Sequence, residues 1–153
     1  MRRKEKEIKD TKEIENIIKS SQICRIAISD EEFPYIVPMN YGYNNNSLYF
    51  HCALNGRKID LLRRNNKVGF EIEQHHKIIK DDVSCNWTTK YRSIIGHGIM
   101  EIIEDLEQKK DGLDILMQQH GKEDNIYNDK AVSKVLILKL SIKSISAKQS
   151  GDY

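Results

Sequence analysis

The sequence predicts a mainly β fold, a small antiparallel barrel with helices on its outside. Six runs of residues show the alternating or continuous apolar pattern of strands, whereas three show the apolar spacing of a helix. Asn44, Asn45 and Asn46 stand between two of the strands, and asparagine tolerates the positive φ angles of a hairpin turn. Residues 134–142 are almost continuously apolar, which indicates burial on both faces, in a barrel or against a partner subunit. This order favours hairpin-linked antiparallel strands over a parallel βαβ sheet.

The first half of the chain predicts a helix, three strands and a shorter second helix. Asp10 is a favourable N-cap, and Glu13 follows three residues later as in a capping box. Pro34 and Pro38 place the second strand at an edge or a bulge, where not every amide donor is needed. The expected elements are, in order, helix 10–20, strands 22–29, 33–43 and 48–54, and helix 56–64.

The second half predicts three more strands and a third helix. Residues 74–91 are polar and irregular, so a long loop is expected there. Gly96 and Gly98 allow the strand that follows to bend or to approach a neighbour closely. The third helix has an apolar side made of Leu113, Leu116 and Met117. The expected elements are strand 67–73, strand 92–103, helix 106–119, a loop at 121–129 and strand 134–142.

The composition is that of one folded domain spanning residues 1–153, with 39% hydrophobic and 31% charged residues. A net charge of +2 gives no global field for binding nucleic acid. No apolar run suits a membrane span or a signal peptide. Residues 1–9 are rich in lysine and arginine and are expected to form a flexible arm. Cys24, Cys52 and Cys85 are odd in number and widely spaced, which favours reduced thiols in the cytoplasm.

The corner between strand 48–54 and helix 56–64 is a candidate phosphate site. A glycine, Gly56, precedes a helix that begins with Arg57 and Lys58. The free amides of a first helical turn point outward, and the helix dipole adds partial positive charge there. Arg57 could bind two phosphate oxygens at once, and Lys58 could add a point charge. The alternative is a strand-to-helix corner whose basic first turn is merely solvated.

Three segments, residues 34–43, 48–60 and 85–96, resemble the FMN-binding split-barrel family of pyridoxamine 5′-phosphate oxidase. Within it the chain is most similar to the branch of nitroimidazole-resistance proteins, and the start Met1-Arg2-Arg3-Lys4 is also similar to that branch. The resemblance covers nearly the whole chain in order and spacing. It implies a six-stranded split barrel that forms a homodimer, with a flavin at each of two sites in the interface.

The resemblance also implies roles for individual residues. Arg57 and Lys58, after Gly56, would hold the phosphate of FMN, and FAD remains an alternative cofactor. Residues of the first two segments would line the ribityl chain and the isoalloxazine ring: Val37, Pro38, Met39, Asn40, His51, Cys52 and Ala53. Residues of the third would reach the flavin from the same chain or from the partner: Trp87, Tyr91, Arg92 and Ser93.

His51 is the candidate catalytic residue. It alternates with Tyr49 and Ala53 on the strand face opposite Phe50 and Cys52, so it could donate a hydrogen bond to the flavin or relay protons to a substrate. The alternative is a structural hydrogen-bonding histidine. Cys52 faces the other side of the strand, so it is not expected to form a thiolate–imidazole pair with His51. We expect Cys52 to be a buried free thiol.

Other histidines and the tryptophan give weaker signals. His75 and His76 are adjacent and so point oppositely in a strand, and Cys85 has no second cysteine nearby, so no metal site is expected. His97 lies between two glycines that either admit a flat ring or bend the strand. Trp87 stands in a polar segment, where it would stack on a ring or pack at a dimer interface.

The resemblance therefore implies an FMN-dependent oxidoreductase that takes small-molecule electron donors and acceptors. The branch resemblance implies nitro-aromatic acceptors such as 5-nitroimidazoles. Oxidation of vitamin B6 is not expected, because residues 143–153 lack the arginine- and histidine-containing segment of the family's pyridoxamine phosphate oxidases. A flavin-binding carrier or sensor without turnover, and a structural dimer without cofactor, are the alternatives.

Overall fold

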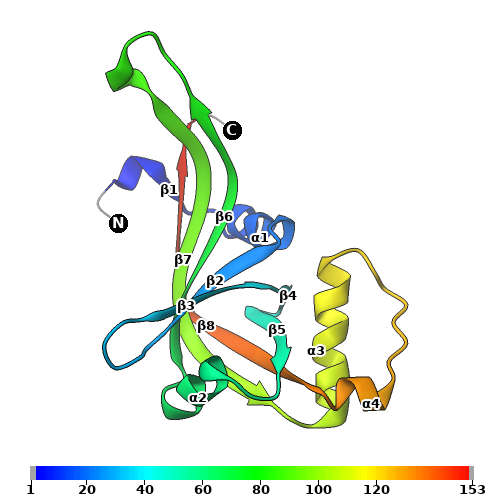
Figure 1. Ribbon diagram of the computed structural model, residues 1–153. Helices are drawn as coiled ribbons and strands as arrows, with labels where there is room; N and C mark the ends of the chain where they lie inside the picture. Colours follow the sequence, from blue (N-terminus) through cyan, green and yellow to red (C-terminus); the bar gives the residue numbers. More distant parts are fainter. Residues whose placement is uncertain (1–2, 152–153) are drawn as a thin grey trace.

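The computed structural model describes residues 3–151, which form one antiparallel sheet curled on itself with helices around it (Figure 1). The strands are β1 Glu7–Ile8, β2 Ile23–Ile28, β3 Tyr35–Asn40, β4 Gly42–Asn44, β5 Ser47–Ala53, β6 Lys67–Ile79, β7 Thr88–Ile103 and β8 Val135–Ser150. The helices are α1 Thr11–Ser20, α2 Arg57–Arg64, α3 Leu106–Gln119 and α4 Asp129–Val132, with 3-10 turns η1 Lys4–Lys6 and η2 Ser84–Asn86. The mainly β, antiparallel prediction is confirmed.

The curl of the sheet follows from its strand order, β3-β2-β6-β7-β8-β5-β4. β3 and β4 form the two ends of this path, yet Tyr41 alone separates them in the chain. The two edges must therefore come together at Tyr41, and the sheet closes into a split barrel. Tyr41 is fully buried, and its hydroxyl donates to the carbonyl oxygen of Ile18 at the end of α1. Burial raises the pKa of this phenol, which fixes it as a neutral donor inside the barrel.

The number of strands was predicted wrongly. Within residues 3–151 the sheet has eight strands, because the expected strand 33–43 breaks at Tyr41 and β1 is added. The expected loop 74–91 is mostly a hairpin in which Ile78 pairs with Thr89. Its polar residues gave no alternating signal because both faces are exposed, and backbone pairing alone forms the strands. β8 runs on past residue 142 to Ser150, where it pairs with β1 and β7 and buries Ala147 and Ser150. The expected loop 121–129 includes Asp129, the first residue of α4.

Part of the segment at residues 1–9, where a flexible arm is expected, pairs with the sheet. Glu7 and Ile8 pair with Lys148 and Ala147 of β8, and the Ile8 side chain is only 5% exposed. One apolar side chain and a free strand edge are enough to attach the segment, which the excess of charge concealed. Met1 and Arg2 lie outside the described residues.

The asparagine hairpin turn is confirmed, whereas only the Asp10 half of the predicted capping box forms. Asn45 and Asn46 adopt positive φ angles of 46° and 56° in the β4–β5 hairpin. Asp10 caps α1 by accepting a hydrogen bond from the amide of Lys12 at 2.9 Å. Glu13 does not complete a capping box; its carboxylate bonds instead to Arg92 of β7, at 3.0 Å.

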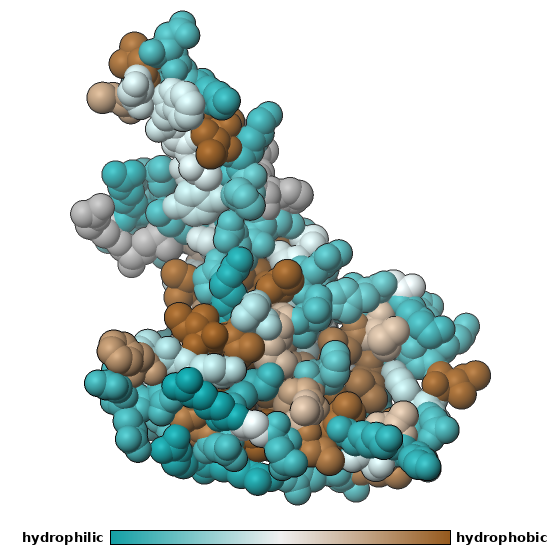
Figure 2. All heavy atoms as spheres, viewed as in Figure 1, coloured by the Kyte–Doolittle hydropathy of each residue, from teal (hydrophilic) through white to brown (hydrophobic). Residues whose placement is uncertain are grey.

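α3 packs on the outer part of the barrel against β4, β5 and β8. Gly42 makes this approach possible, because a Cβ there would lie 2.4 Å from the carbonyl oxygen of Ile115. On the far side of the molecule, the hairpin of β6 and β7 projects well beyond the barrel as an arm, here defined as residues 76–91 (Figure 1). Figure 2 shows apolar side chains on its outer end, and Ile78, Val83 and Trp87 are 58%, 57% and 49% exposed.

None of the helices within the described part of the chain is long and apolar enough to cross a membrane.

Candidate flavin site at the β5–α2 corner

The β5–α2 corner has the backbone geometry that the sequence predicted. β5 ends at Ala53, and α2 begins at Arg57 with Gly56 as its N-cap. Gly56 has φ 130°, a conformation that strains any residue with a side chain, and no atom lies within 4 Å of the position its Cβ would take. The Gly56 carbonyl accepts from the amides of Ile59 and Asp60, at 2.8 and 3.2 Å. The amides of Arg57 and Lys58 come before these in the helix and have no acceptor within it.

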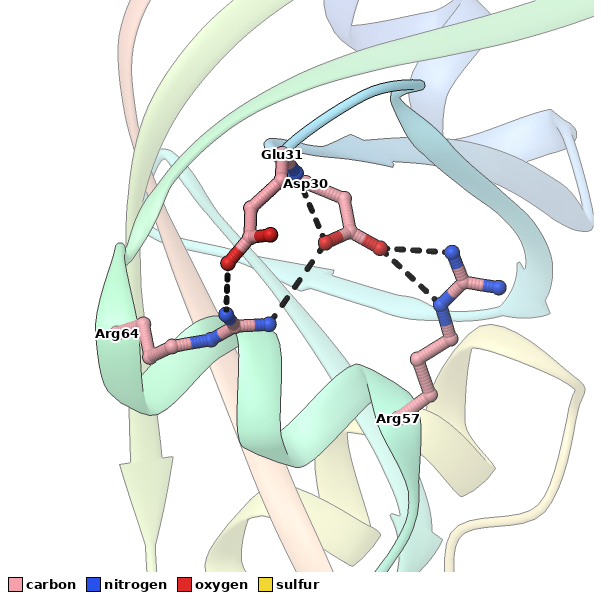
Figure 3. Close-up of polar contacts among 4 residues, drawn as sticks. All are labelled: Asp30, Glu31, Arg57 and Arg64. Carbon is pink, nitrogen blue, oxygen red and sulfur yellow. Dashed lines mark hydrogen bonds and ion pairs between the residues drawn. The ribbon is translucent and has the colours of Figure 1, made fainter.

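Arg57 is already bound to a carboxylate of the same chain. Its Nε and Nη2 atoms both donate to Oδ2 of Asp30, at 3.2 and 2.7 Å (Figure 3). Arg64, one helix length away, lies 3.7 Å from the other Asp30 oxygen and bonds to Glu31 at 3.3 Å. The hydrogen bond from Arg57, together with that from the Glu31 amide, holds the pKa of Asp30 below its ordinary range. A phosphate at this corner must share Arg57 with Asp30.

Lys58 is in the opposite situation. Its side chain is half-buried, and its Nζ lies 3.4 Å from the Met39 sulfur of β3. No carboxylate pairs with Lys58 among residues 3–151. Its charge also acts on Cys52 of β5, although burial dominates there and raises the pKa of the thiol. A half-buried ammonium held between β3 and β5 without a counter-charge is a ready partner for an anion.

The strands beside Lys58 carry the first two groups of predicted site residues, but alternation divides them between two faces. On β3, Val37 and Met39 are half-buried against the core, whereas Pro38 and Asn40 are exposed. These four residues therefore cannot line one surface. The same holds on β5, where Cys52 packs against the core. The predicted opposition of His51 and Cys52 is confirmed, and Cys52 is a free thiol that is half-buried.

His51 and Asn40 meet in a cavity of about 450 Å³ beneath α3. The remaining lining residues all come from α3 and the position after it: Leu113, Leu116, Met117 and His120. His120 was not a predicted site residue. Its position was nevertheless visible in the sequence, because it continues the i, i+3, i+4, i+7 spacing of the apolar side of that helix.

Comparison with known proteins identifies the family to which this barrel belongs. Residues 10–149 match the family described as pyridoxamine 5′-phosphate oxidase. The chain is a member of the pyridoxamine 5′-phosphate oxidase family. A candidate 5-nitroimidazole antibiotic resistance protein from Bacteroides thetaiotaomicron is similar to it, with 37% identity, a TM-score of 0.83, and coverage of 94% of this chain and 86% of that one.

Solved structures of lower sequence identity share the fold. A FAD and heme binding protein from Mycobacterium smegmatis has a TM-score of 0.86 at 19% identity, and the match covers 97% of this chain and 75% of that one. The flavocytochrome Anf3 from Azotobacter vinelandii has a TM-score of 0.85 at 16% identity, over 99% and 72% of the two chains. An uncharacterized protein from Rhizobium meliloti is 34% identical over 62 residues, which is 40% of either chain.

The third predicted segment of this family member does not meet the corner within one chain. Trp87 lies on the arm, at the opposite end of the molecule from α2 (Figure 1). Its indole donates to the Asp81 carbonyl at 2.7 Å, and Lys80 lies 5.7 Å from its ring centroid. At the base of the arm, Tyr91, Arg92 and Ser93 are half-buried, and Arg92 bonds to α1. The structure thus brings two of the three segments together.

The remaining polar residues have structural partners. His97 lies 3.0 Å from the Ser144 hydroxyl, and the register of β7 and β8 shifts beside it. Gly96 and Gly98 lie where a Cβ would meet Phe70 or the β8 backbone, so bending and close packing account for them. Among the side chains that the structure describes, no three metal-ligating residues cluster. Arg63 and Arg64, at the end of α2, each donate a hydrogen bond to a glutamate carboxylate, those of Glu104 and Glu31.

Proposed function

We propose that the chain is an FMN-dependent oxidoreductase that binds the cofactor phosphate at the β5–α2 corner. The observation that carries this proposal is Lys58, a half-buried ammonium without a carboxylate partner among residues 3–151, at the start of a helix. The names of two relatives, a FAD and heme binding protein and a flavocytochrome, support a flavin in general. FMN is the proposed flavin, and mass spectrometry of the released cofactor distinguishes it from FAD.

In this proposal the chain's own residues bind and orient the flavin, which supplies the redox chemistry when bound. Lys58 and the first amides of α2 bind the phosphate, and Arg57 adds hydrogen bonds while it remains anchored to Asp30. The ring system lies along the exposed face of β3 and β5 that carries Asn40 and His51, next to the cavity that these two residues line, because Met39 and Cys52 face the core. His51 holds a proton at the edge of that cavity and donates it to the reacting group.

The active form in this proposal is a homodimer. The arm is the main support for it, because a projecting hairpin with exposed apolar side chains stabilises little in an isolated chain. The arm projects away from the β5–α2 corner of its own chain. In a dimer, the arm of the partner would bring Trp87 and the residues up to Ser93 toward the flavin. The free cysteines among the described residues support a reducing compartment, the cytoplasm.

The proposed electron acceptors are nitro-aromatic compounds such as 5-nitroimidazoles. This rests on the relative that is 37% identical and named as a candidate 5-nitroimidazole antibiotic resistance protein. The reduced flavin would supply the electrons, and a small-molecule donor such as a reduced nicotinamide would restore it. Neither nucleic acid nor a membrane is a proposed partner.

The test is the absorbance spectrum of the purified protein before and after incubation with FMN. Flavin bands that remain after gel filtration are expected, and colourless protein that cannot be reconstituted would refute the proposal. Oxidation of reduced nicotinamide in the presence of a nitro-aromatic compound is then expected in the steady state. Stable flavin binding without turnover would refute the enzyme and indicate a flavin carrier or sensor.

A further inference from the structure

The cavity beneath α3 has a composition unlike that of the corner. Its size of about 450 Å³ suits a molecule of one or two rings. The apolar residues Leu113, Leu116 and Met117 form one wall, and the polar residues Asn40, His51 and His120 line the rest. No lysine, arginine, aspartate or glutamate is among the lining residues. The cavity therefore favours an uncharged ligand, whereas the corner, with Lys58, favours an anion.

The polar groups of the cavity are available to a ligand. Within the described part of the chain, the rings of His51 and His120 have no hydrogen bond or ion pair with another residue. The Asn40 amide is oriented by its bond from Nδ2 to the Gln22 carbonyl, at 3.2 Å, which leaves its oxygen as an acceptor. An imidazole can donate or accept a hydrogen bond. The cavity thus combines an apolar wall with polar groups that have unused bonding capacity.

The α3 wall is held in place at the end that carries His120. The side-chain amide of Gln119 donates to three carbonyl oxygens where α1 ends, those of Ile18, Lys19 and Ser21, at 3.1, 2.8 and 3.2 Å. Gly42 admits the helix to within contact of β4. His120 directly follows the anchored residue, so its backbone position is fixed relative to the barrel.

We infer that this cavity is a subsite for an uncharged, planar heteroaromatic ring, with His120 as a specificity-determining residue. The ring packs on the wall of Leu113, Leu116 and Met117, and His120 donates a hydrogen bond to an acceptor at the ring edge. His51, on the other side of the lining, faces the same ring from β5. This inference rests on the proposed function in one respect: the ring is the electron acceptor of the flavin.

The experiment uses 2-methyl-5-nitroimidazole as the uncharged probe and measures its binding by calorimetry, with and without FMN. Met117→Trp fills the cavity, and Gln118→Trp, an exposed neighbour on α3, is the matched control. We expect Met117→Trp to weaken probe binding at least about tenfold, because it removes the apolar contact of a whole ring. FMN binding should change less than about twofold, and Gln118→Trp should leave both unchanged.

His120→Ala provides the second measurement. We expect the KM for the probe to rise roughly five- to tenfold at unchanged kcat, which is the loss of about one hydrogen bond. His120→Gln, which keeps a donor, should recover part of it. The anionic 4-nitrobenzoate should bind the wild type more weakly than the probe, since no cation lines the cavity.

The outcomes separate this inference from the proposed function. If Met117→Trp abolishes FMN binding, the cavity holds the flavin ring itself and the inference is wrong. If neither FMN nor probe binding changes in Met117→Trp, the probe binds elsewhere and the inference is also wrong. If the wild type binds the probe but not FMN, the proposed function fails while the uncharged-ring subsite stands.

Discussion

Replacement of Lys58 by methionine should weaken FMN far more than riboflavin. The two ligands share the ring and the ribityl chain and differ in the phosphate, so their affinity ratio isolates the phosphate contacts. Methionine keeps most of the side-chain volume next to Met39, whose sulfur lies 3.4 Å from the Lys58 ammonium. The substitution should therefore remove the charge without opening a cavity between β3 and β5.

The size of the effect follows from the partners that each cation has. A hydrogen bond to a charged group contributes about 2 kcal/mol, which corresponds to about 30-fold in affinity. Lys58 should contribute this in full, since among residues 3–151 it has no carboxylate partner to give up when it binds phosphate. Arg57 is 63% exposed and bonded to Asp30, so Arg57→Ala should cost less, roughly three- to tenfold.

The assay is fluorescence titration of apoprotein with FMN and with riboflavin, at fixed ionic strength. Riboflavin affinity should change less than about threefold in Lys58→Met, within the range of a small local repacking. Lys122→Met, in the loop after α3, is the control for removal of one positive charge from the whole protein. An unchanged ratio of FMN to riboflavin affinity in Lys58→Met would show that the phosphate lies elsewhere.

Three further predictions concern the rest of the molecule. Asp30→Asn should lower the unfolding free energy at neutral pH but not in strong acid, as measured by urea titration. The lowered pKa of Asp30 stabilises the folded state above the ordinary aspartate pKa, and this is lost as the pH falls through the lowered value. If the proposed homodimer buries the exposed apolar side chains of β7, Ile95→Glu, at a side chain that is 60% exposed, should shift the protein to monomers in light scattering. Gly42→Ala should destabilise the fold by roughly 1–3 kcal/mol in thermal unfolding, since its Cβ would clash with the Ile115 carbonyl.

The fold was predictable wherever a strand buries one face. The alternation in β2 and β5 and the asparagine turn between β4 and β5 gave correct elements, because burial and turn geometry are local consequences of sequence. The arm was not predictable in this way. Its strands are exposed on both faces and are formed by pairing between residues such as Ile79 and Thr88, so no periodicity marks them.

The candidate site was predictable as a corner but not as a network. The sequence predicted that Gly56 precedes a helix starting with Arg57 and Lys58, and this is confirmed. It could not predict that Arg57 forms an ion pair with Asp30, 27 residues earlier, because that contact depends on how the β2–β3 turn folds over α2. His120 was predictable only in part. Its place on the apolar side of the helix follows from the spacing in the sequence, but the sequence does not show that this side faces His51 of β5.

Arg57 and Lys58 therefore have different roles, although the sequence alone gives no reason to distinguish them. The hydrogen bonds to Asp30 fix the orientation of the Arg57 guanidinium, and the Asp30 carboxylate already neutralises most of its charge. The Lys58 ammonium is not neutralised by a carboxylate among residues 3–151, and only its contact with the Met39 sulfur orients it. A phosphate that binds both gains orientation from the first and most of its electrostatic attraction from the second. For this reason the Asp30 contact does not argue against an anion site at the corner; it supplies the rigidity that a lone lysine lacks.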